Sequence, residues 1–121
     1  MNLVKTTLAT LAISSLSTLA LAAESVTVAE LHAKRTELAG QQISVTGKVI
    51  KVNNGVMRRN FVHVQDDSAN ATYDRVIFTS QDSTEVGDTV TATGTVKLDT
   101  DFGMGYFYPT LVEQASVKPA Q

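Results

Sequence analysis

A strict alternation of apolar and polar side chains in the C-terminal third of the chain constrains the fold most. Between Val90 and Leu98 every second residue is apolar or glycine, and the intervening residues are three threonines and Lys97. A period of two places successive side chains on opposite faces of an extended strand. The pattern therefore predicts a half-buried β-strand, which needs neighbouring strands to cover its apolar face.

Four further segments alternate in the same way or are rich in β-branched residues, which predicts a set of five strands. Gly47 lies inside the first segment, and a glycine there is typical of a bulge or a sharp bend around a small barrel. Pro109 lies inside the last and indicates an edge position or a bulge. The four segments run from Gln42 to Val52, from Asn60 to Asp66, from Arg75 to Thr79 and from Tyr106 to about Val117. The predicted connections include a turn at Asn53-Asn54-Gly55 and a glycine-rich loop from Asp99 to Gly105.

One helix is predicted ahead of the strands. Thr27 and Glu30 have the spacing of a capping box, in which a hydroxyl and a carboxylate accept the first free amides of a helix. Gly40 supplies a stop, so the pattern predicts a helix from Val28 to Leu38. One helix and five short strands indicate an all-β domain, with a small five-stranded Greek-key barrel favoured over a sandwich, which needs more strands.

The first residues have the composition of a cleavable secretory signal. Lys5 is the only charged residue before Glu24, and Ala20-Leu21-Ala22 has the small-x-small pattern of a cleavage site. Serine and threonine dilute the intervening apolar stretch below the roughly 20 apolar residues of a membrane span. We predict a signal peptide over residues 1–22, cleaved after Ala22 or alternatively Ala23, and one domain over residues 23–121 with no stable membrane anchor.

Charge and cysteine content limit the location and the partners. The chain has no cysteine, although small secreted domains often depend on disulfides, and this favours a periplasmic protein with a well-closed sheet. Removing residues 1–22, with Lys5, from a 121-residue chain with 10 basic and 12 acidic residues leaves 99 residues with a net charge of −3. This mild acidity argues against general attraction to nucleic acid or anionic membranes.

Three segments together resemble small exported bacterial OB-fold proteins, which are often labelled nucleic-acid-binding because of their fold. The segments are Ile43-Ser44-Val45-Thr46-Gly47-Lys48-Val49, Asn60-Phe61-Val62-His63-Val64-Gln65-Asp66 and Asp101-Phe102-Gly103-Met104-Gly105-Tyr106. The resemblance implies a five-stranded OB-fold barrel and suggests an oligonucleotide as ligand. After Asp66 the chain has Asp67-Ser68-Ala69-Asn70, where such families commonly carry a glycine-containing turn.

OB-fold barrels bind ligands across their second and third strands, between the loops that join strands one to two and four to five. Arg58-Arg59 is the only adjacent cationic pair on the predicted barrel, and nearby aromatic residues would complete a surface for base stacking and phosphate pairing. In an alternative arrangement, Phe61 packs beneath a loop and the arginines keep a strand edge soluble. The predicted ligand-binding residues are Lys51, Arg58, Arg59, Phe61, His63, Arg75, Phe102 and Tyr106.

The sequence offers little for catalysis. It has no Gly-x-Ser-x-Gly motif and no cysteine to act as a nucleophile or a zinc ligand. His32 is expected to be a solvated helix residue, and His63 to pack on a strand face beside Phe61. Asp99-Thr100-Asp101-Phe102-Gly103 resembles the start of a calcium loop, but Tyr106 to Thr110 adds no carboxylate. We therefore expect no enzyme, no cofactor and no metal.

The sequence leaves more than one function open. The first hypothesis is a non-enzymatic periplasmic binding module that takes an anionic or aromatic ligand, such as an oligonucleotide or another anionic oligomer. The alternative is a protein-interaction or envelope-stress accessory domain with no nucleic-acid ligand, in which an exposed strand edge from Tyr106 to Val117 pairs with a partner chain. A remote third option is solute or metal binding through His63 and nearby carboxylates.

Overall fold

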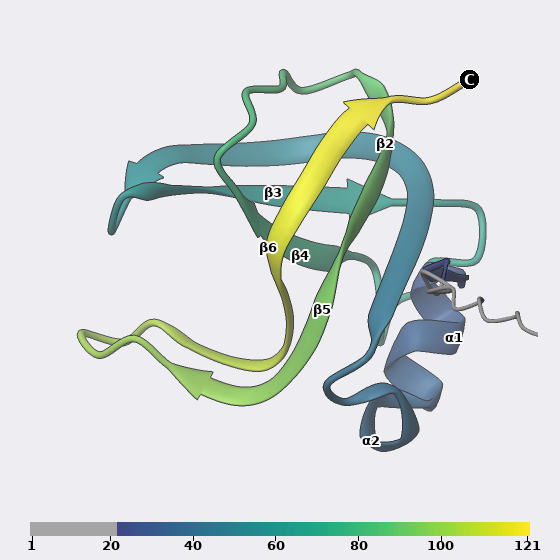
Figure 1. Ribbon diagram of the computed structural model, residues 1–121, viewed down its shortest axis with the longest axis horizontal. Helices are drawn as coiled ribbons and strands as arrows, with labels where there is room; N and C mark the ends of the chain where they lie inside the picture. The colour runs from purple at the N-terminus through teal and green to yellow at the C-terminus, as the bar shows by residue number, and fades with distance from the viewer. Residues whose placement is uncertain (1–21) are drawn as a thin grey trace, which may run out of the picture.

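A computed structural model describes residues 22–121, and within them the chain is mostly β-strand (Figure 1). The predicted signal peptide lies outside the described residues, apart from Ala22. Within the same range, no helix has both the length and the apolar character to cross a membrane. The elements are β1 (Glu24–Ser25), α1 (Val28–Ala33), α2 (Arg35–Leu38), β2 (Gln42–Val56), β3 (Arg59–Gln65), β4 (Val76–Ser80), β5 (Thr89–Asp101) and β6 (Phe107–Pro119).

The predicted capping box is confirmed, but the predicted single helix is divided. Thr27 Oγ1 accepts a hydrogen bond from the Glu30 amide at 3.1 Å, and the Glu30 carboxylate accepts one from the Thr27 amide at 2.9 Å. The helix breaks at Lys34, where φ is −110° and ψ is 24°. No glycine or proline marks this break in the sequence, so the pattern predicts one helix from Val28 to Leu38.

The strands of the described region form one sheet in the order β1-β2-β3-β4-β6-β5. An additional pairing joins β2 to β5, so the six-stranded sheet partly closes into a ring. The five predicted strands correspond to β2–β6. The predicted count was wrong by one, because the two-residue β1 also pairs, in parallel, with the start of β2.

β2 closes the ring because it pairs with two partners in succession. Its first half, Gln42 to Lys48, pairs with β5, and the remainder pairs with β3. The strand bends sharply between the two halves (Figure 1). Gly47 lies in this region, where an added Cβ atom would meet the carbonyl oxygen of Gln65 well inside van der Waals contact. The bend predicted at Gly47 is therefore present, and glycine is needed for the close approach of β3.

The turn between β2 and β3 lies later than predicted. Asn53-Asn54-Gly55 belongs to β2, and the two-residue turn is Met57-Arg58, with φ values of 52° and 66°. Asn54 and Gly55 together lie opposite Asn60, which makes a bulge. The Gly55 amide, in a residue with φ of 71°, donates to Asn60 Oδ1 at 3.0 Å. The positive φ that glycine permits is therefore used in the bulge, at Gly55. The turn itself places two bulkier residues, Met57 and Arg58, at positive φ.

The core is the aliphatic interior of the ring. Val62 and Val64 of β3 are buried there, as their alternation predicted, together with Phe78 of β4. The same cluster contains side chains of every strand from β2 to β6, and Leu31 and Leu38 of the helices. β5 also follows its predicted pattern, with Val90, Ala92 and Val96 buried, Leu98 partly buried against the cluster and Lys97 exposed. Phe61 and Leu111 are buried as well, but outside this cluster.

Within residues 22–121, the pairing of β4 with β6 is the shortest in the ring. The strands run parallel and align only at Phe78 with Val112 and at Ser80 with Ala115. Between these pairs β6 has one extra residue, and Gln114 adopts a φ of 54°. The main-chain ladder is therefore interrupted at this point of the ring, and we call this region the β4–β6 seam.

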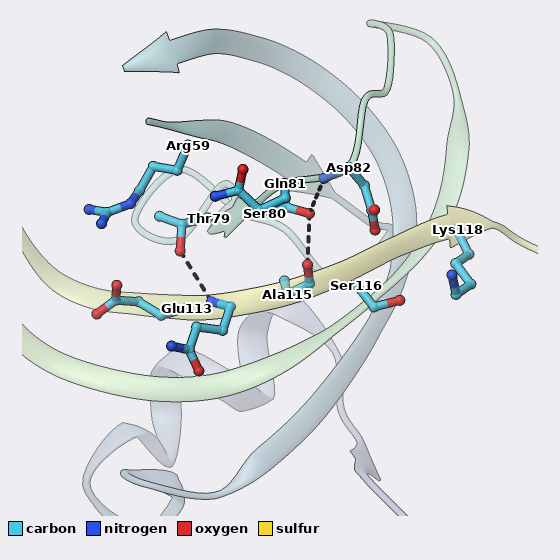
Figure 2. A pocket seen from close by; sticks show the side chains of 10 residues that line it. Arg59, Thr79, Ser80, Gln81, Asp82, Glu113, Ala115, Ser116 and Lys118 are labelled. Atoms are coloured by element: carbon cyan, nitrogen blue, oxygen red, sulfur yellow. Dashed lines mark hydrogen bonds between the residues drawn. The ribbon is translucent and has the colours of Figure 1, made fainter. Parts of the chain in front are cut away.

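Polar side chains take the place of the missing ladder at the seam (Figure 2). Each joins β4, or a residue just after it, to a main-chain group of β6. Ser80 Oγ donates to the Ala115 carbonyl at 2.7 Å, Thr79 Oγ1 accepts from the Gln114 amide at 3.3 Å, and Asp82 Oδ2 accepts from the Val117 amide at 2.8 Å. Closure of the ring thus depends on individual side chains at this point.

Candidate ligand-binding surface

An aromatic cluster on the outside of the ring joins the β5–β6 hairpin to β3. Phe61 lies on the face of β3 opposite the core and is 1% exposed. The Phe102 ring meets it edge-on, with centroids 5.9 Å apart, and Tyr108 stacks on it at 5.5 Å. Phe61 therefore packs beneath the β5–β6 hairpin, which is the alternative arrangement considered from the sequence. We call Phe61, Phe102 and Tyr108 the aromatic cluster.

Arg59 from the β2–β3 hairpin adjoins this cluster, and Arg58 precedes it in the turn. The guanidinium carbon of Arg59 lies 4.9 Å from the centroid of the Phe102 ring, within the range of a cation–π interaction. Arg58 is exposed in the turn, and its carbonyl accepts a hydrogen bond from Gln81 Nε2 at 2.9 Å. Tyr106 is exposed on the opposite hairpin. The structure thus brings Arg59, Phe61 and Phe102 together and leaves Arg58 and Tyr106 open to solvent.

A polar hollow of about 540 Å³ adjoins Arg59 along the β4–β6 seam (Figure 2). Its lining carries both charges, with Arg59 and Lys118 facing the same space as Asp82 and Glu113. It is lined by Arg59, Thr79, Ser80, Gln81, Asp82, Glu113, Gln114, Ala115, Ser116 and Lys118. Such a surface offers hydrogen-bond donors and acceptors next to the aromatic cluster.

The other predicted residues of β3 and its neighbours form a second group around His63. His63 is 8% exposed, and its Nδ1 lies 3.3 Å from Nη1 of Arg75. Burial, followed by the positive charges of Arg75 and Lys51, lowers the pKa of His63 from 6.5 to about 4. At neutral pH the imidazole is therefore uncharged, and Nδ1 can accept a hydrogen bond from the guanidinium.

Arg75 is held in place by Asp74. Its Nη2 and Nε donate to the two carboxylate oxygens of Asp74 at 2.9 and 3.1 Å. This hydrogen bonding lowers the pKa of the Asp74 carboxyl and raises the pKa of the Arg75 guanidinium. Both groups are charged at neutral pH, and the pair fixes the direction in which the guanidinium points.

A second hollow, which we call the helix-side groove, lies between the helices and the first residues of β6. Its volume is about 500 Å³, and it is lined by His32, Arg35, Thr72, Tyr73, Asp74, Arg75, Ile77, Tyr108, Pro109 and Thr110. The expectation that His32 is solvated was wrong. Its Nε2 lies 2.7 Å from the Arg75 carbonyl oxygen, and its ring stacks on Tyr73 with centroids 4.7 Å apart.

Sequence reasoning missed Tyr108 and Tyr73. Tyr108 belongs to a strand in which two aromatic residues are adjacent, Phe107 and Tyr108, so the alternation alone does not show which one packs against Phe61. Tyr73 lies in the polar loop before β4, where no periodic signal exists. Only the tertiary fold brings Tyr73 into contact with His32.

Comparison with known proteins adds no relative. Neither a scan against models of protein families nor a search of curated proteins finds a match to this chain. Within residues 22–121, no three His, Asp or Glu side chains are grouped so that they could hold a metal ion.

Proposed function

We propose that this protein is a non-enzymatic periplasmic binding module with an OB-fold barrel. Its ligand is an anionic oligomer, such as an oligonucleotide, bound across the outer face of β3 and the two hairpins beside it. The observation that carries the proposal is the stacking of Arg59 on Phe102, because it places a cation on an aromatic platform between these hairpins.

The strand arrangement supports the OB-fold part of the proposal. β2–β6 make a partly closed ring of five strands, and an OB-fold is a five-stranded, partly open Greek-key barrel. The β2–β3 and β5–β6 hairpins extend from the same side of the ring (Figure 1). They correspond to the loops between strands one and two and strands four and five, which flank the ligand in OB-folds.

The chemistry of the surface supports an anionic oligomer. Tyr106 is exposed and Phe102 is partly exposed, and stacking of a base on an aromatic side chain contributes about 1–3 kcal/mol. Arg58 and Arg59 can pair with phosphate or another anion, and the polar hollow beside Arg59 can accommodate neighbouring groups of the ligand. Phe61 contributes by supporting Phe102 from below.

The periplasmic location rests on the N-terminal composition and affects the choice of ligand. Nucleic acid is uncommon outside the cytoplasm, and a net charge of −3 after cleavage gives no general attraction to it. The proposal therefore specifies the chemistry of the ligand, repeated anionic groups with planar or apolar units between them, and treats an oligonucleotide as one instance of this class.

Fluorescence anisotropy with two labelled probes tests this function. The probes are an oligodeoxythymidine of about 12 nucleotides, within the site size of one OB-fold, and a heparin oligosaccharide of similar length. Arg58→Ala/Arg59→Ala should weaken binding at least about tenfold, and loss of two phosphate contacts should reduce the slope of log K against log salt by about 1.4. Lys34→Ala/Lys97→Ala removes the same charge from exposed positions elsewhere and is the control.

The two probes distinguish the sources of the anionic ligand. Binding of the oligodeoxythymidine alone would identify base stacking as essential, and equal binding of both would identify a general polyanion site. If neither probe binds, or if the hairpin and control variants have the same affinity and salt dependence, the ligand face is wrongly assigned.

The alternative of a strand-pairing partner receives less support from the geometry. Only the first part of the predicted edge is free, because β6 pairs with β4 at Val112 and Ala115 and with β5 throughout. In the free part, Pro109 has no amide to donate, and its carbonyl already accepts from Arg35 Nη2 at 2.7 Å. A stoichiometric protein partner recovered from periplasmic extract would nevertheless favour this alternative.

A further inference from the structure

The helix-side groove has the size and lining of a small-molecule site. Its volume of about 500 Å³ falls within the roughly 300–1,000 Å³ of ligand pockets. The lining combines apolar and aromatic surface from Tyr73, Ile77, Tyr108 and Pro109 with a few charged groups. Pockets of this kind bind a ligand by its apolar body and orient it through the polar groups.

The aromatic wall of the groove is held in place before any ligand arrives. Tyr73 is 43% exposed, yet its ring stacks on His32 with an angle of 10° between the planes. His32 is itself fixed by the 2.7 Å contact of its Nε2 with the Arg75 carbonyl oxygen. A ring fixed in this way loses little conformational entropy when a planar ligand stacks against it.

Two guanidinium groups line the same groove, and each side chain is 32% exposed. Arg35 Nε donates to Thr110 Oγ1 at 2.8 Å, and its Nη2 donates to the Pro109 carbonyl at 2.7 Å. Nη2 also lies 3.5 Å from the exposed Asp99 carboxylate. Within residues 22–121 these contacts involve Nε and Nη2, so the Nη1 donors of a firmly positioned cation remain for a ligand.

The second cation, Arg75, is less available to an anionic ligand. Both oxygens of Asp74 are bonded to it, so the negative charge of this carboxylate is already matched inside the groove. Arg35 is paired less closely, with an exposed Asp99 carboxylate at 3.5 Å that does not line the groove, so its Nη1 donors are the more available cationic partner for a ligand, beside the apolar and aromatic surface. A ligand that satisfies both features has a flat apolar body and one anionic group.

We propose that the helix-side groove is a second binding site, for a small planar aromatic molecule that carries a carboxylate. The aromatic ring packs against the lining near Tyr73, Ile77 and Tyr108, and the carboxylate pairs with the guanidinium of Arg35. The site lies away from Arg58 and Arg59, and it does not depend on the binding of an oligomer by the hairpins.

An NMR titration with two matched probes tests this site on the unaltered protein. Naphthalene-2-carboxylate carries the required charge, and naphthalene-2-carboxamide has nearly the same shape without it. We expect saturable amide shifts centred on Tyr73, Arg75, Ile77 and Tyr108 with the carboxylate. The carboxamide should bind at least about tenfold more weakly, because a neutral amide cannot form the ion pair, with two acceptor oxygens, that a carboxylate makes with a guanidinium.

Variants distinguish stacking of the ligand on Tyr73 from nonspecific hydrophobic binding. Tyr73→Ala should weaken binding of the carboxylate about three- to tenfold, as expected for loss of one aromatic pair, whereas Tyr73→Phe should retain it. Phe107→Ala is the control, because Phe107 is an aromatic residue of similar exposure, at 52%, that does not line the groove. Arg35→Gln should reduce the affinity for the carboxylate to that for the carboxamide.

The probe comparison needs no substitution, so it remains decisive even if a variant folds poorly. Absence of saturable shifts, shifts centred on Arg58, Arg59 and Tyr106 instead of the groove, or equal affinities for the two probes would overturn the proposal. Equal weakening by Tyr73→Ala and Phe107→Ala would do so as well. These results leave the oligomer assay unaffected, so the two proposals can fail separately.

Discussion

Replacing Ser80 by alanine removes a hydroxyl that makes two hydrogen bonds at the β4–β6 seam. Ser80 is 2% exposed, and its Oγ donates to the Ala115 carbonyl at 2.7 Å and accepts from the Asp82 amide at 2.9 Å. A buried polar group left without a partner costs about 1–3 kcal/mol. The Asp82 amide is partly buried and can bond to water instead, so most of the cost comes from the Ala115 carbonyl that loses its partner. We expect the free energy of unfolding to fall by about 2 kcal/mol.

Urea denaturation followed by circular dichroism measures this loss directly. In a domain of this size a loss of about 2 kcal/mol should also lower Tm by about 8–16 °C. Ser116→Ala is the matched control, because it deletes a half-buried hydroxyl from the lining of the same hollow and should change stability by less than about 0.5 kcal/mol. A similarly small loss for Ser80→Ala would refute the conclusion that the seam depends on this hydroxyl.

Two further perturbations test the bend in β2 and the buried imidazole. Gly47→Ala should lower the free energy of unfolding by about 2–3 kcal/mol, since the new methyl group overlaps the Gln65 carbonyl. Gly103 lies in open space at a φ of 84°, so Gly103→Ala is the control and should lower the free energy of unfolding by only about 1–2 kcal/mol in the same urea assay. A larger loss for Gly103→Ala than for Gly47→Ala would show that β3 moves to accommodate the methyl group. Because the pKa of His63 is about 4 in the folded protein and 6.5 when unfolded, the unfolded chain takes up this proton first as the pH falls. Stability should therefore decline between pH 6.5 and 4, by at most about 3 kcal/mol, and His63→Gln should remove this part of the slope in urea titrations across that range. An unchanged slope would show that His63 takes up its proton at the same pH in the folded and the unfolded protein.

The sequence predicts the strands well where one face of a strand is buried in the ring. The alternation of β5 and the inward positions of Val62 and Val64 are local properties, and the structure confirms them. The break at Lys34 and the turn at Met57-Arg58 are less accessible, because neither site carries the residues that usually mark such features. A more typical turn sequence, Asn54-Gly55, lies three residues earlier, and the pattern therefore predicts the turn there.

The candidate surface was only partly predictable, because its outer face is shaped by contacts between distant segments. Alternation placed Phe61 outside the core, but its burial depends on Phe102 and Tyr108 from the other hairpin. The helix-side groove similarly requires His32 and Tyr73 to meet across the fold. Such pairs leave no periodic signal in the chain.

The two halves of β2 differ in how soon they can find their partners during folding. The half after Gly47 meets β3 across a two-residue turn, and hairpins of this kind form within about 1–10 μs. The half before it must wait for β5, where Gln42 aligns with Thr95, and closing so long a loop slows the step. Until β5 arrives, one side of a folded hairpin presents an unpaired edge through which two chains could associate. The rate at which the β5–β6 hairpin docks therefore governs how long each newly synthesised molecule is exposed to aggregation.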